Sequence, residues 1–274
     1  MRHKRLNTST ALLAREAIVA PVERARKKNT PWVVDENDLH IKIDDMLTER
    51  DVDLIEWLVK HGEPTRIRGG EVAFKFSLYA AANALGQSRG RIIERIRRRQ
   101  KTLIDVRQGD WVCTAQMFGP SLRNMREGVY MIAFTRQFAE LWNHGLRLHY
   151  ADLVDDILPI ASPVVRRLVR RTINHETRKL EGETRKESIK HFLEKIRLGA
   201  DATEESKKEM WRIASNDIKA AADYLEAIFG IEIVTLKDGQ LGLKYKRDDS
   251  DKRIWCENGA CVPLPSDDRT AEAA

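Results

Sequence analysis

The side chains with the clearest chemistry lie in residues 88–101, whose sequence is SRGRIIERIRRRQK. This run holds seven Arg or Lys residues and one Glu, so its local charge of +6 equals the formal net charge of +6 of the whole chain. The planar guanidinium group of arginine can bond two oxygens of a phosphate, or O6 and N7 of guanine in the major groove. The run therefore predicts binding to a polyanion, in agreement with a sequence pI near 9.2.

Helical periodicity divides this run into two faces. Its three isoleucines share one face, and Arg91, Arg95, Arg98 and Thr102 form a stripe roughly opposite. Arg97 lies nearer the apolar edge, where contact with backbone phosphate is expected. The alternative is a solvated basic helix that pairs with acids elsewhere, but a turn before the run and a hairpin after it favour DNA. The DNA contacts predicted for this half are Ser88, Arg89, Arg91, Arg95, Arg98, Arg99, Lys101 and, in the hairpin, Arg107.

A second basic arc lies on the polar side of a helical pattern over residues 204–229. Asn can pair bidentately with adenine, which suits DNA reading, but an exposed flank of an amphipathic helix has the same composition. Trp211 sits at an apolar position and is expected in the core. The candidate DNA contacts of this half are Lys207, Lys208, Arg212, Asn216, Lys219 and Lys244.

Four further arginines cluster at positions 166, 167, 170 and 171. A phosphate clamp and packing of the aliphatic stems over the core edge are equally compatible with this spacing. No DNA contact is assigned to them.

Motifs for catalysis are missing from the sequence. The seven His residues show no His-hydrophobe-His pair of the kind that rolling-circle initiators use, and no GxxxxGK[ST] phosphate loop is present. Three Cys residues supply neither a disulfide framework nor a zinc site. No apolar run reaches the roughly 20 residues of a membrane span, and no signal peptide is recognised. We expect a soluble, non-enzymatic protein of the cytoplasm with no cofactor, no metal and no membrane contact.

The basic run needs elements that position it, and the flanking pattern supplies them. Thr48 opens a helix with Asp51 at the N3 position of a capping box, and Gly62 and Pro64 end it. A strand over residues 72–76 precedes Ser77, the N-cap of a short helix over residues 78–85. After the basic helix, residues 103–106 and 111–116 flank a Gly-containing turn and predict a hairpin. Helix, strand, helix, turn, basic helix and hairpin is the order of a winged helix.

The second half repeats this order. Ser162 and Pro163 open a helix, residues 187–198 form a shorter one, and residues 204–229 predict a single uninterrupted helix. A hairpin follows over residues 231–236 and 241–245. The prediction is an α+β, mainly helical protein with two tandem winged-helix domains. We divide it into a flexible basic arm (1–38), an N-terminal winged helix (39–145), a C-terminal winged helix (146–247) and a disordered tail (248–274).

From about residue 38 to residue 245 the chain resembles the iteron-binding plasmid replication initiators with tandem winged helices, and among them the TrfA-like branch. The similarity lies in residues 76–86 (FSLYAAANALG) ahead of an Arg-rich helix, residues 158–167 (LPIASPVVRR), and Lys207-Lys208 followed by Trp211-Arg212. The resemblance implies binding of double-stranded DNA at repeated origin sites, help in opening the origin, and partners in the host replication machinery such as the replicative helicase. It also implies a homodimer as an autoregulatory form.

Two other functions stay open at this point. A winged-helix transcriptional regulator would use the same helices without opening an origin. A protein-interaction module would use the long helix of residues 204–229, with the basic helix incidental.

Overall fold

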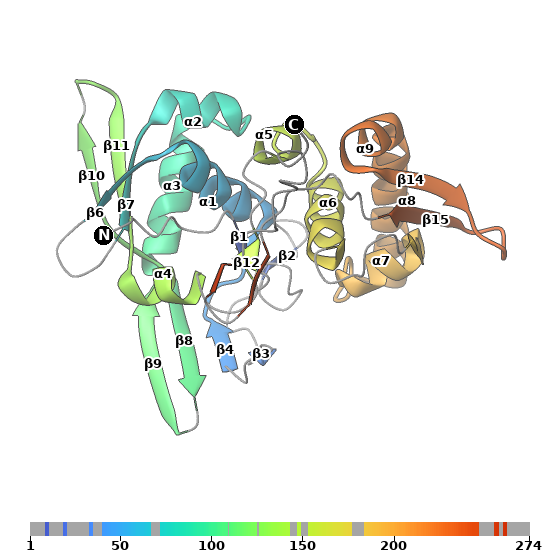
Figure 1. Ribbon diagram of the computed structural model, residues 1–274, viewed down its shortest axis with the longest axis horizontal. Helices are drawn as coiled ribbons and strands as arrows, with labels where there is room; N and C mark the ends of the chain where they lie inside the picture. The colour runs from blue at the N-terminus through green and yellow to red at the C-terminus, as the bar shows by residue number, and fades with distance from the viewer. Residues whose placement is uncertain are drawn as a thin grey trace, which may run out of the picture.

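The computed structural model describes residues 9–10, 19–20, 33–34, 40–66, 72–108, 110–124, 126–142, 147–148, 153–176, 184–246, 255–257 and 260–261. Within these ranges helices alternate with small, mostly antiparallel sheets (Figure 1). The predicted α+β class is confirmed at this level.

The first half follows the predicted order closely. Its elements are β4 (His40–Ile43), β5 (Leu47–Thr48), α1 (Glu49–His61), β6 (Glu63–Arg66), β7 (Val72–Ser77), α2 (Leu78–Ala84), α3 (Arg89–Lys101), β8 (Leu103–Gln108), β9 (Trp111–Gln116), β10 (Phe118–Asn124), β11 (Val129–Phe134) and α4 (Arg136–Trp142). Both predicted N-caps are confirmed. The Asp51 carboxylate accepts from the Thr48 backbone N–H at 2.7 Å, and Ser77 Oγ accepts from the Ala80 N–H at 3.3 Å.

The pairing of strands in this half was not predicted. β8 and β9 form the expected antiparallel hairpin, and this hairpin extends a sheet with β4 and β3 (Val33–Val34). β7 pairs instead with β6 and β11, and β11 pairs with β10. The strand before α2 therefore lies in a different sheet from the hairpin after α3.

The second half contains α5 (Val154–Ile157), α6 (Pro163–Glu176), β13 (Thr184–Ser188), α7 (Ile189–Lys195), α8 (Glu204–Ala220), α9 (Ala222–Phe229), β14 (Ile231–Thr235) and β15 (Leu241–Lys246). The predicted hairpin is confirmed as β14 and β15, and β13 joins it in a sheet of order β13-β15-β14. The helix expected over residues 187–198 is shorter, because residues 187–188 pair with β15 and Ser188 becomes the N-cap of α7.

The single helix predicted over residues 204–229 is wrong, since the chain breaks at Ala221 into α8 and α9. Ala221 has φ −94° and ψ 5°, and its N–H is shared between carbonyls of the preceding turn. Beyond the break, Leu225 and Phe229 are buried while Ile228 is 42% exposed. Leu225 and Phe229 of α9 continue the buried stripe that Ala214 and Ile218 form on α8.

Short strands near both ends of the chain pair with strands of the central part of the chain. β2 (Val19–Ala20) is buried and runs parallel to β5. β1 (Ser9–Thr10), β12 (Arg147–Leu148), β16 (Trp255–Glu257) and β17 (Ala260–Cys261) share a sheet. The remainder of the predicted arm and tail lies outside the described residues.

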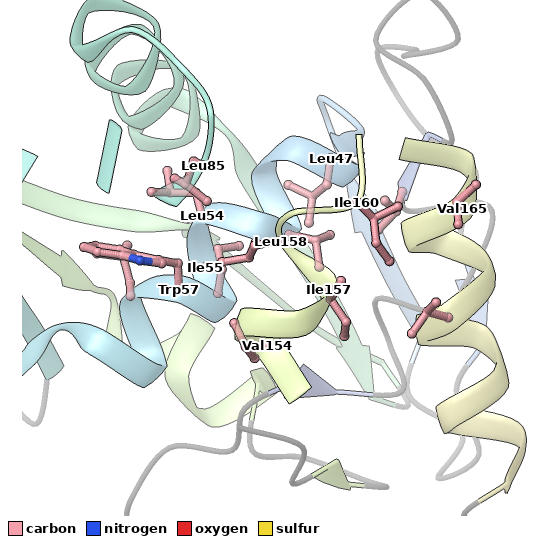
Figure 2. Close-up of a cluster of buried hydrophobic side chains, with 14 of the residues drawn as sticks. Leu47, Leu54, Ile55, Trp57, Leu85, Val154, Ile157, Leu158, Ile160 and Val165 are labelled. Carbon is pink, nitrogen blue, oxygen red and sulfur yellow. The ribbon is translucent and has the colours of Figure 1, made fainter. Parts of the chain in front are cut away.

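One cluster of buried apolar side chains runs through both halves. Figure 2 shows Ile55 of α1 near Leu158, with Val154 and Ile157 of α5 below them and Val165 of α6 farther to the right. α5 and α6 both contact α1, so the two halves share a common core. The division of domains at residues 145 and 146 stays a prediction.

Candidate nucleic-acid interface

The basic helix α3 follows α2 after a tight turn. Gly86 in that turn has φ +58°, a conformation that glycine adopts without the steric cost of a side chain. Ser88 is the N-cap of α3, and its Oγ accepts from the Arg91 N–H at 3.3 Å. Ile92 and Ile96 are fully buried and Ile93 is partly buried, so the predicted apolar face is confirmed. Packing of this face fixes which side of α3 meets solvent.

The solvent-facing arc of α3 is more basic than acidic. Arg91, Arg97 and Lys101 are exposed, and so are the N-cap Ser88 and Arg89 at the helix start. Arg98 is 27% exposed, and its Nη2 lies 3.7 Å from Oε1 of Glu94, the acid within this arc. We use the name α3 face for the solvent-facing side of this helix, which consists of Gly90, Arg91, Glu94, Arg97, Arg98 and Lys101. The face can bind phosphates, and its guanidinium groups can bind guanine.

Arg99 does not belong to this face, and its predicted DNA contact is wrong for the structure described. Its side chain is 1% exposed. Its Nε lies 3.1 Å from Asp51 Oδ1, and its Nη1 and Nη2 donate to the carbonyls of Asp45 and Met46 at 2.8 and 3.1 Å. Because its donors are used inside the protein, Arg99 connects α3 to the segment that precedes α1.

Arg95 is also turned inward, which corrects its predicted place on the DNA-reading stripe. Its Nη1 lies 3.0 Å from Thr48 Oγ1 and 3.1 Å from Asp51 Oδ1, and its side chain is 12% exposed. Thr102, placed on the same stripe, is buried as well. The edge of α3 that carries these residues packs on the start of α1.

Asp51 is the residue that both arginines share. It is fully buried, and burial alone would raise its pKa, but Arg99, Arg95 and the hydrogen bonds from Thr48 outweigh burial, so the pKa of Asp51 lies below its usual value. The same carboxylate caps α1 and holds α3. Sequence analysis assigned Asp51 only its capping role.

We predict that Asp51→Asn lowers the free energy of unfolding by about 3–5 kcal/mol near neutral pH, because it leaves Arg99 buried without its charge partner. Asp51 binds a proton more readily in the unfolded state than in the folded state, because its pKa is lowered in the folded state. The stabilisation that ionised Asp51 provides is therefore present above the pKa of the unfolded state, and it is lost as the pH falls through the pKa of the folded state. Urea unfolding between pH 7 and pH 3 should show a smaller loss on acidification in the variant than in the wild type. Asp110→Asn, at an exposed position, is the control. Equal acid sensitivity of Asp51→Asn and the wild type would refute this role.

The candidate residues of the second half lie on a helix without excess charge, since α8 holds four basic and four acidic residues. Lys208, Asn216 and Lys219 are exposed. Arg212 is also exposed, but Glu209 accepts from its Nε and Nη2 at 2.8 and 2.7 Å. Lys207 Nζ lies 3.8 Å from Glu204 Oε1. Pairing along the helix therefore reduces the cationic character of this arc.

Three further predicted residues have defined surroundings. Trp211 is partly buried, and its Nε1 donates to the Leu198 carbonyl at 2.8 Å, which confirms a structural position for its ring. Lys244 of β15 lies opposite Glu232 of β14, and its Nζ contacts both carboxylate oxygens at 2.9 and 2.7 Å. Arg107 is exposed on β8 of the hairpin. Lys244 is thus already paired within its own hairpin.

The arginine cluster of α6 is buried against α1 and does not face solvent. Arg170 contacts three carboxylates, with Nη1 to Glu49 Oε2 at 2.7 Å and Nη2 to Asp53 Oδ1 and Glu56 Oε2 at 2.8 Å each. Arg167 lies 3.2 Å from Glu49, and Arg166 lies 3.1 Å from Asp53. Burial lowers the pKa of Arg166 to about 10. These side chains join α1 to α6 and are not available as a phosphate clamp.

A signal for this cluster was present in the sequence. Glu49, Asp53 and Glu56 are spaced by four and three residues, so they share one face of the predicted helix. Three acids on a face that also borders the core require cationic partners when buried. Arg171 has a separate partner, because its Nη1 lies 3.0 Å from both oxygens of Glu187.

No protein-family model matches the chain, and no curated protein shows significant sequence similarity to it. In the part of the chain that the structure describes, no helix is both long and apolar enough to cross a membrane. Across those same residues, no group of three or more His, Cys, Asp or Glu side chains is arranged to hold a metal ion.

Proposed function

We propose that this protein binds double-stranded DNA through the α3 face. The observation that carries the proposal is the exposure of Arg91, Arg97 and Lys101 on a helix that follows a short helix and a Gly-containing turn. An α-helix of this kind fits the major groove, where its N-terminal residues reach base edges. A surface that served only solubility would not need so many cations of one sign on one helix face.

Both halves are proposed to be winged helices. In each half a helix, a strand, two helices and a hairpin follow in order, as α1, β7, α2, α3, β8 and β9 and as α6, β13, α7, α8, β14 and β15. In the second half the strand before α7 pairs with the hairpin, whereas in the first half β7 and the β8–β9 hairpin lie in different sheets, so only the element order supports a winged helix there. The difference in charge between α3 and α8 supports α3 as the main DNA-binding helix.

The role proposed for this binding is initiation of plasmid replication at repeated origin sites, with host helicase and polymerase recruited afterwards. This step rests on the resemblance of residues 76–86, residues 158–167 and the Lys207–Arg212 segment to the iteron-binding initiators. A transcriptional regulator with the same fold remains the alternative.

Footprinting of the purified protein on the DNA that flanks its own gene tests the binding. We expect protection of repeated sites, each about two helical turns or roughly 20 bp long if both halves contact one face of the duplex. Autonomous replication of a plasmid that carries only the gene and these repeats separates an initiator from a regulator. Protection without replication favours a regulator, and no protection on any duplex rejects the proposal.

A further inference from the structure

Glu94 stands at an unexpected place for a surface that binds phosphate. It lies in the middle of the α3 face, its side chain is 71% exposed, and the basic residues Arg91, Arg97 and Arg98 surround it in the helix. A carboxylate repels phosphate, so a face that made only backbone contacts would bind better without it.

The fold gives little reason to keep an acid at this position. The nearest cationic atom recorded for Glu94 is Arg98 Nη2 at 3.7 Å, which is too long for a strong hydrogen bond. Exposed ion pairs between residues four apart on a helix contribute little to protein stability. Glu94 is therefore not explained by stability.

One turn before Glu94, the helix surface is open. Gly90 shares the α3 face with Glu94, and a Cβ added to Gly90 would meet no atom within 4 Å. Glycine within a helix is less favourable than alanine, and packing does not require it here, so Gly90 leaves room for another molecule to approach the backbone. With α3 in a groove, Gly90 would let the first turn of the helix approach closely, and Glu94 would face base edges while the arginines beside it reach phosphates.

A carboxylate in the major groove can accept from an exocyclic amino group. Cytosine N4 and adenine N6 both carry such donors, but adenine also presents N7, an acceptor that repels a carboxylate. The geometry points to Glu94 as a specificity-determining residue that selects a C·G pair by accepting from cytosine N4. This inference rests on the proposed DNA binding and extends it to the base that α3 reads.

The test measures both affinity and base preference. Duplexes are selected from a random 20-bp library with the wild-type protein, and each base pair of the selected duplex is then changed in turn. For the wild type, changing one C·G pair to T·A should lower affinity at least tenfold, which corresponds to about 1.4 kcal/mol. Glu94→Ala should bind both duplexes within about twofold of each other and bind unrelated duplex more tightly than the wild type does.

One control variant and one further test variant make the result specific. Glu226→Ala removes an exposed acid from α9 and should leave the base preference unchanged. Gly90→Ala should keep or raise the melting temperature and yet weaken binding to the selected duplex at least tenfold. If Glu94→Ala keeps the wild-type preference at every pair, the inference is overturned while DNA binding stands. If the wild type binds no duplex, both the inference and the proposed function fall.

Discussion

Arg170→Met is expected to lower the free energy of unfolding by about 3–5 kcal/mol, because removing one partner of a buried ion cluster leaves its charges uncompensated. Arg170 donates to Glu49, Asp53 and Glu56 of α1, and these four side chains are nearly or fully buried. Burial also raises the pKa of Glu49, so its charge depends on the arginines beside it. Urea unfolding followed by circular dichroism measures the effect.

Lys190→Met is the matched control, since Lys190 is exposed on α7 and its replacement should change stability by less than about 0.5 kcal/mol. If Arg170→Met fails to fold, the double variant Glu56→Met with Arg170→Met keeps the test open, because it removes one charge of each sign and should recover part of the loss. A fully stable Arg170→Met protein that loses duplex affinity would instead make α6 a DNA-binding element, contrary to our assignment.

Replacing Arg91, Arg97 and Arg98 together with Ala is expected to weaken duplex binding by at least about 3 kcal/mol, more than 100-fold, since each direct contact of this type is worth roughly 1–3 kcal/mol. The fold should survive, because Arg91 and Arg97 are exposed and Arg98 has an exposed partner. Fluorescence anisotropy with a labelled duplex measures the change.

The matched control removes the same charge from elsewhere. Lys190, Lys195 and Lys237 are exposed on α7 and in the β14–β15 turn, and replacing all three with Ala should weaken binding much less. Equal losses for the two triple variants would mean that net charge, and not the α3 face, determines affinity.

Much of the local structure could be predicted from the sequence, because its signals are local. Thr48 with Asp51, Gly62 and Ser77 mark helix ends, and all of these ends are found. The break at Ala221 had no such signal, since alanine is the best helix former.

The solvent-facing residues of α3 were predicted in part. Arg95 and Arg97 lie at similar angular distances from the centre of the polar arc of α3, on opposite edges, so the sequence of the helix alone does not separate them. Asp51, more than forty residues earlier in the sequence, accepts hydrogen bonds from Arg95 and Arg99 and so turns both side chains inward. Only tertiary contacts show that Arg97 faces solvent and that Arg95 does not.

The central claim is that the α3 face binds phosphate and bases of a duplex, and its most direct test is the salt dependence of binding. The logarithm of the affinity falls with the logarithm of salt concentration by about 0.9 for each phosphate neutralised. Between 50 and 200 mM salt we predict a steep slope for the wild type and a slope shallower by about 2 to 3 for the variant with Ala at positions 91, 97 and 98. Identical slopes for the two proteins would contradict the account.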